Sequence, residues 1–172
     1  MDADLGDLSS VGGRWQLRFR RRLPHPPTKV WRALTEPEHL RVWFPTDIEG
    51  DRAVGAKLRF PFREGEGPTM DGEMLVYDEP RVLAFRWGDD ELRFELEPDG
   101  DGCRLTFLET IDEQGRAARD ATGWHVCLTV LAQRLDGRRP APSSWKALNE
   151  RYIEGFGPEA ATIGPPPGAT VD

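Results

Sequence analysis

The sequence has few of the residues, and none of the short motifs, that mark the common enzyme classes. Its two cysteines, Cys103 and Cys127, form no CxxC pair, and its three histidines, His25, His39 and His125, lack the spacing of metal ligands. No GxSxG nucleophile motif, P-loop or GxGxxG motif occurs among the 172 residues. The sequence therefore predicts no metal, no cofactor and no catalytic residue.

Long apolar runs and an excess of positive charge are also absent. No stretch of 18 apolar residues exists, so no membrane span is expected. The first ten residues, MDADLGDLSS, have neither the basic start nor the apolar core of a secretory signal. A net charge of −7 disfavours nonspecific binding to nucleic acid. Because two isolated thiols suit a reducing compartment, we expect a cytoplasmic protein.

What is present is an alternating pattern that predicts six β-strands. In residues 14–23, RWQLRFRRRL, apolar and basic side chains alternate, as in a strand with one buried face. Five further strands follow between residues 57 and 111, separated by short turn sequences. Asp99-Gly100-Asp101-Gly102 is the strongest of these hairpin signals. Because such short turns cannot make parallel crossovers, we expect one antiparallel sheet.

Helical spacing predicts two short helices between the first and second strands and a long one after the last. Pro27 and Pro37 each suit a helix start, and residues 116–136 carry one apolar stripe that ends before Gly137. A shorter helix from Trp145 follows. The long helix is large enough to cover the sheet. We therefore predict an α+β fold, in which a curved six-stranded antiparallel sheet wraps around a long C-terminal helix.

The expected domain is a single unit of residues 13–157, since 172 residues suit one core. Residues 1–12 are predicted to be a mobile tail. Residues 158–172, which contain four prolines and few apolar side chains, are predicted to be a disordered tail.

Three segments resemble a known superfamily. They are VWRALTEPEHLRVWF (30–44), the DG and DEPRVLAFRW pieces within 71–87, and GWHVCLTVLAQRLDG (123–137). They are similar to the SRPBCC superfamily, the helix-grip fold of START domains, polyketide cyclases and the birch-pollen allergen. The likeness is greatest to homologues of the C-terminal domain of the activator of the ninety-kilodalton heat-shock protein ATPase. This resemblance implies a helix-grip fold and, for those homologues, a co-chaperone or stress-response role.

The predicted ligand site lies between the concave face of the sheet and the long helix. A strongly twisted sheet around one helix leaves space near its mouth, where small ligands are commonly held. The candidate ligand-binding residues are Phe60, Met74, Phe85, Trp87 and Phe107 of the sheet, Trp124, His125 and Leu128 of the helix, and the charged residues Arg21 and Glu109.

Arg21 and Glu109 are charged residues at apolar-face positions of the first and last strands. In the resembled fold these two strands are antiparallel neighbours. A buried charge without a partner is costly, so we predict that Arg21 and Glu109 form a pair on the concave side.

Three functions follow as hypotheses from these observations. The first is a binding module that holds a hydrophobic small molecule, lipid-like or aromatic, in the cavity. The second is a protein-interaction module whose partner is a chaperone or another protein. The third is a cyclase-like or dehydratase-like enzyme that uses Glu109 or His125 as an acid or base. A homodimer is left open.

Overall fold

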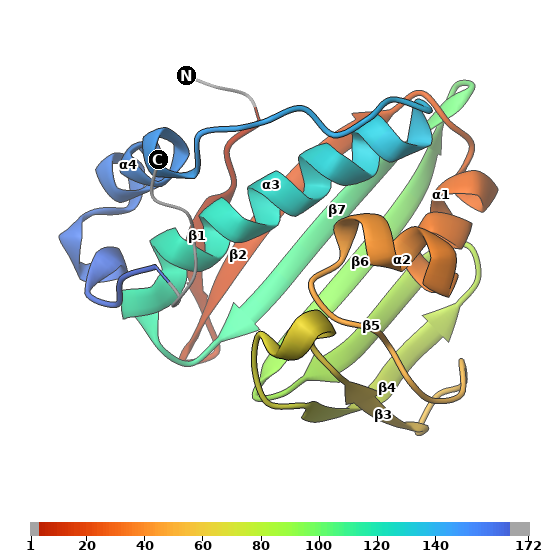
Figure 1. Ribbon diagram of the computed structural model, residues 1–172, viewed down its shortest axis with the longest axis horizontal. Coiled ribbons are helices and arrows are strands. Elements are labelled where there is room, and N and C mark those ends of the chain that lie inside the picture. Colours follow the sequence, from red (N-terminus) through yellow and green to blue (C-terminus); the bar gives the residue numbers. More distant parts are fainter. Residues whose placement is uncertain (1–3, 166–172) are drawn as a thin grey trace.

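The computed structural model describes residues 4–165, and its centre is one curved antiparallel sheet (Figure 1). Its order is β1-β2-β7-β6-β5-β4-β3. The strands are β1 (Asp7–Val11), β2 (Arg14–Leu23), β3 (Lys57–Phe60), β4 (Met70–Asp78), β5 (Val82–Trp87), β6 (Asp90–Asp99) and β7 (Gly102–Ile111). The predicted α+β helix-grip fold is confirmed, with seven strands in place of six.

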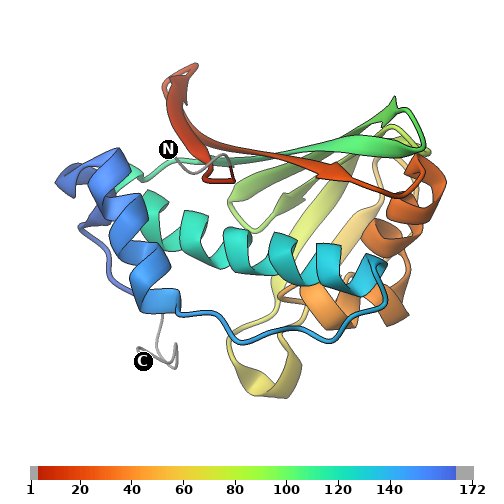
Figure 2. The same ribbon diagram turned by 90° about the horizontal axis from the view of Figure 1, so that it is seen from above.

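Four α-helices of the described residues lie on the concave side of this sheet, and in Figure 2 strand β2 (red) runs above the longest of them (teal). They are α1 (Pro27–Thr35), α2 (Pro37–Trp43), α3 (Ala117–Leu135) and α4 (Trp145–Phe156), and three short 3-10 turns are η1 (Arg63–Gly65), η2 (Gln114–Arg116) and η3 (Pro158–Ala161). The long helix α3 crosses the concave face, as predicted for residues 116–136. No helix within the described range combines the length and apolarity needed to cross a membrane.

The core forms where α3 meets the middle strands. Trp124, Leu128 and Leu131 of α3 are at most 4% exposed. Opposite them, Phe107 of β7 stacks on Phe94 of β6 with 4.6 Å between ring centroids. This packing buries the apolar stripe that α3 could not bury alone.

Strand register depends on two glycines. Gly100 has a φ of +59° in the β6–β7 turn, a backbone conformation that residues other than glycine rarely adopt. Gly72 of β4 is a point of close approach, because a Cβ there would clash with the carbonyl oxygen of Arg86. The hairpin joins β6 and β7 so that Leu92 lies opposite Glu109.

Both predicted tails contain ordered structure. Asp7–Val11 forms strand β1 against β2, which corrects the prediction of a mobile tail at 1–12. At the other end, η3 packs beside η2, Ala160 is fully buried, and the Ile163 N–H donates to the Gly115 carbonyl at 3.0 Å. The rest of the predicted C-terminal tail, 166–172, and residues 1–3 lie outside the described residues.

Candidate functional site

A cavity of about 760 Å³ lies between the first half of α3 and the adjoining ends of β4, β5 and β6. Its side chains come from the sheet, from the connection between β3 and β4, and from both α3 and α4. The lining includes Phe62, Met70, Trp87, Asp90, Glu109, Arg116, Asp120, Gly123, Trp124 and Trp145. The volume falls within the range of small-molecule sites in proteins.

Aromatic rings form one wall of the cavity. The rings of Trp87 and Trp124 lie 5.4 Å apart between centroids, and Phe62 lies 6.4 Å from Trp87. The Trp87 indole N–H donates to Thr46 Oγ1 at 3.2 Å, which fixes the ring. Trp145, the first residue of α4, completes the aromatic lining.

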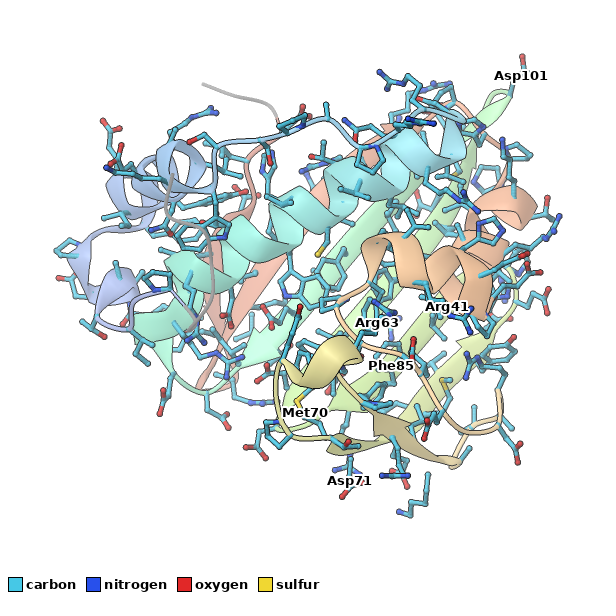
Figure 3. The ribbon with its side chains drawn as sticks, in the orientation of Figure 1. Arg41, Arg63, Met70, Asp71, Phe85 and Asp101 are labelled. Atoms are coloured by element: carbon cyan, nitrogen blue, oxygen red, sulfur yellow. The ribbon has the colours of Figure 1, made fainter. Side chains whose placement is uncertain are left out.

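The connection between β3 and β4 is held in place by Arg63. Its guanidinium donates to the backbone carbonyls of Phe44 and Thr46 at 2.7 and 2.8 Å and contacts Asp47 at 3.0 Å. Figure 3 shows Arg63 next to α2, with Met70 at the start of β4 on the other side of the turn. These bonds satisfy the carbonyls at the end of α2 and position Phe62 and Met70 at the cavity.

A charged cluster lies at the inner end of the cavity. Asp90 begins β6 and Glu109 projects from β7, and their side chains are only 8% and 1% exposed. Arg116 of η2 contacts Asp90, pairs with Asp120 at 2.6 Å and lies 3.8 Å from Glu109. Arg119 adds a contact of 3.1 Å to Asp120. Three carboxylates thus share two guanidinium groups.

Glu109 is the least satisfied member of this cluster. No donor among the described residues makes a hydrogen bond to its buried Oε2. Burial raises the pKa of Glu109 well above its usual range, and the Asp120 and Asp90 carboxylates add to the rise. The Trp124 indole and the Arg116 charge oppose it more weakly. The empty cavity therefore favours the protonated form of Glu109 more than water does.

Burial also raises the pKa of two neighbouring groups. The pKa of Asp90 rises because of burial, against the opposing charge of Arg116. The Cys127 thiol, which lines the cavity, has its pKa raised to about 12 by burial, so it is uncharged and a poor nucleophile.

Asp90, Glu109 and Asp120 place carboxylate oxygens within 4.8 Å of one another, as ligands of a metal ion would be. The Arg116 guanidinium, however, contacts all three carboxylates. A metal ion would therefore have to displace a cation that the chain itself supplies.

Of the ten predicted ligand-binding residues, Trp87, Glu109 and Trp124 line the cavity. Five others are core residues at most 1% exposed, namely Phe60, Met74, Phe85, Phe107 and Leu128. Phe85 lies in the middle of the sheet in Figure 3. Their tight packing leaves no space for a ligand around them.

The predicted pair of Arg21 and Glu109 is wrong. Arg21 lies opposite Leu105 in the register of β2 and β7, whereas Glu109 lies opposite Leu17. The four-residue offset along the strand corresponds to roughly 13 Å. Arg21 instead extends over the Phe19 ring, 5.8 Å from its centroid. Glu109 has Arg116 as its nearest cation.

His125, the remaining predicted site residue, lies away from the cavity lining. Its Nδ1 is 2.8 Å from the hydroxyl of Tyr152 on α4, and that hydroxyl also accepts the Gly6 N–H at 2.9 Å. This side chain therefore joins α3 to α4 and to the segment before β1.

The sequence pattern missed Asp90, Arg116 and Asp120. Asp90 belongs to Gly88-Asp89-Asp90, which has the composition of an exposed turn. Arg116 and Asp120 are four residues apart at the start of a helix, a spacing typical of ordinary surface pairs. The four-residue spacing was the sequence signal for this pair, but it does not indicate that Arg116 and Asp120 are largely buried.

The fold agrees with comparisons to known proteins. A family model described as Activator of Hsp90 ATPase homolog 1-like protein matches residues 24–136. The chain belongs to this family. The resemblance stated from sequence is therefore confirmed. No curated protein matches the sequence of this AHSA1-like chain at a significant level.

Solved structures share the AHSA1-like fold. EF2215, a conserved protein of unknown function from Enterococcus faecalis, has a TM-score of 0.76 at 21% identity, covering 88% of this chain and 90% of that one. CalU16 from Micromonospora echinospora has a TM-score of 0.70 at 21% identity, covering 88% and 92%. The Aha1 dimer from Colwellia psychrerythraea has a TM-score of 0.59 at 23% identity, covering 70% and 95%. At these identities the likeness shows the fold alone.

Proposed function

We propose that this AHSA1-like chain is a binding module for a hydrophobic small molecule, held between the sheet and α3. The observation that carries the proposal is the cavity of about 760 Å³ whose wall contains Phe62, Trp87, Trp124 and Trp145. A soluble protein gains stability by filling such a space with its own side chains. An aromatic ligand would pack against these rings and remove their surfaces from water.

The cavity also contains a polar group suited to orienting a ligand. Glu109 Oε2 is buried and has no hydrogen bond from the described residues, and small-molecule sites typically combine apolar walls with a few such groups. The aromatic walls favour the binding of apolar ligands in general, and a polar contact to Glu109 would distinguish ligands that carry a matching polar group from those that do not. These features support a ligand with one polar group on an apolar body.

The test is binding of a small aromatic compound to the purified chain. Isothermal titration calorimetry with 1-naphthalenemethanol should show one site, and native mass spectrometry after mild purification should show any retained ligand. Gly123→Phe supplies the site control, since Gly123 lines the cavity and a Cβ there meets no atom within 4 Å. Equal binding by this variant and the native chain would contradict the proposed site.

A co-chaperone-like interaction is the second candidate, favoured by the family description and by the fold shared with the Aha1 dimer. Its test is a pull-down of the cognate ninety-kilodalton chaperone with the full chain. Retention of the chaperone by the native chain and by Gly123→Phe alike would support an interaction independent of the cavity. No retention by either would contradict it.

A further inference from the structure

We propose that the cavity selects ligands that carry a protonated amine next to an aromatic ring, with the amine paired to Glu109. This inference rests on the proposed function and specifies the ligand class of the same site. Its two independent supports are the charge balance of the buried cluster and the kind of side chain that surrounds it.

With all three of its carboxylates ionised, the buried cluster has one cation too few. Asp90, Glu109 and Asp120 are three carboxylates, and within the described part of the chain their ion pairs come from Arg116 and Arg119. Asp90 and Asp120 each make close contact with a guanidinium group, whereas the contact to Glu109 is 3.8 Å. A third cation at Glu109 would balance the cluster.

The unsatisfied atom is directed to the ligand space. Glu109 is 1% exposed, lines the cavity and has no hydrogen bond to Oε2 among the residues described. An ammonium group supplies the donors that Oε2 lacks, and charge-assisted hydrogen bonds of this kind are the strong ones. A neutral hydroxyl could donate one hydrogen bond but could not balance the charge of an ionised Glu109.

The walls suit the same ligand. Trp87 and Trp124 lie side by side, and the faces of aromatic rings attract cations. An anionic ligand would instead meet Asp90 and Asp120, and Asp71 and Asp89 also line the cavity. Arg86 and Arg119 line it too, but each is already within 4 Å of a carboxylate, on Glu73 and Asp120. The arrangement therefore disfavours a carboxylate ligand.

Binding of an amine moves one proton. With the cavity empty, burial and the Asp120 and Asp90 carboxylates raise the pKa of Glu109 and so favour its protonated form; its neighbours Asp90, Arg116 and Asp120 come from β6, η2 and α3. When an ammonium group binds, the Glu109 O–H bond breaks, the carboxylate stays with the ammonium ion and the proton leaves to the buffer. Binding of the amine should then be accompanied by proton release.

The experiment compares three probes that share the naphthalene ring and carry a cationic, a neutral or an anionic one-carbon group: 1-naphthylmethylamine, 1-naphthalenemethanol and 1-naphthoic acid. Isothermal titration calorimetry of the native chain at pH 7 should show the amine binding about tenfold tighter than the alcohol, and the acid weakest. Repeating the amine titration in phosphate and in Tris gives the number of protons released. An acid or alcohol that binds as tightly as the amine overturns the inference.

Variants then locate the preference. Glu109→Gln keeps the shape of the side chain but not its charge, so the amine should bind it no better than the alcohol, without proton release. Glu91→Gln is the matched control, because Glu91 is the next residue after Asp90 and is absent from the cavity lining. An amine preference that survives in Glu109→Gln overturns the inference.

The probes also separate this inference from the proposed function. Binding of the alcohol without a preference for the amine overturns the inference and leaves the cavity as a ligand site. Failure of all three probes to bind the native chain overturns both. Because the comparison of probes needs no variant, it stands even where Glu109→Gln fails to fold.

Discussion

The guanidinium of Arg116 lies 3.8 Å from the carboxylate of Glu109 while it contacts Asp90 and Asp120 more closely. One side chain from η2 therefore joins strands β6 and β7 to the first turn of α3. The same contact leaves Glu109 with the weakest compensation of the three acids. The cluster therefore contributes to stability, and under the proposed function the same three acids would select the ligand; both effects can be measured.

The first expectation concerns pH. Because the pKa of Glu109 is raised in the folded chain, the folded state binds more protons than the unfolded state above about pH 4.3. The contribution of Glu109 to stability is therefore complete below that pH, and it is lost as the pH rises through the pKa that Glu109 has in the folded chain. Asp90 changes in the same direction. The free energy of unfolding, measured with urea, should fall from pH 5 to pH 8. The fall should be at most about 1.4 kcal/mol per pH unit for each of Glu109 and Asp90.

Glu109→Gln should flatten this dependence, because glutamine does not titrate. The pKa of Asp136 is lowered, mainly through its hydrogen bond with His25, so its effect is lost only in more acidic solution and does not interfere above pH 5. Parallel pH profiles for the native chain and Glu109→Gln would contradict the assignment of the dependence to Glu109.

The second expectation concerns Arg116→Gln. Removing one partner from a buried ion-pair network costs about 3–5 kcal/mol, and the 23% exposure of Arg116 places the loss near the lower end. Arg104→Gln removes an exposed contact of 3.6 Å to Asp99 and should cost less than about 1 kcal/mol. Urea unfolding at pH 7 measures both. If the two variants lost the same free energy of unfolding, burial of the cluster would add nothing to the stability of the fold.

The sequence predicted the elements of this fold well because their signals are local. Pro27, Pro37 and Gly137 mark helix ends, and Asp99–Gly102 marks a hairpin, within a few residues of where each acts. Strand β1 was missed because most of DLSSV is exposed and lacks a strong apolar alternation. Pairing with β2 provides the order that its own sequence does not specify.

The candidate site was harder to predict because it depends on register between distant strands. Glu109 was selected from its position on an apolar face and does line the cavity, but its predicted partner Arg21 lies four residues away along β2. A shift of four residues leaves every side chain on the same face, so alternation alone cannot detect it. Asp90 is buried because β6 begins at that residue and α3 covers it, and neither fact is visible in a local turn motif.

The third expectation concerns Gly123 on α3. Because its Cβ position is open, Gly123→Ala should raise the free energy of unfolding by about 0.5–1 kcal/mol through helix propensity. Naphthalenemethanol should still bind this variant, whereas Gly123→Phe should lose most binding. Gly155 of α4 is also open but does not line the cavity, so Gly155→Phe is the matched control. Loss of binding in that control would contradict a local effect.

The fourth expectation concerns Tyr152, whose hydroxyl connects α4 with Gly6 and His125. The hydroxyl is buried, so Tyr152→Phe leaves the Gly6 N–H without its acceptor, and an unsatisfied buried donor costs about 1–3 kcal/mol. Amide hydrogen exchange at Gly6 should become faster, and the His125 ring should lose its Nδ1 contact in nitrogen NMR spectra. Tyr77→Phe provides the control, because Tyr77 lies on β4, far along the sheet order from β1. If Gly6 exchanges at the native rate in Tyr152→Phe, the hydroxyl does not hold the start of the chain against α4.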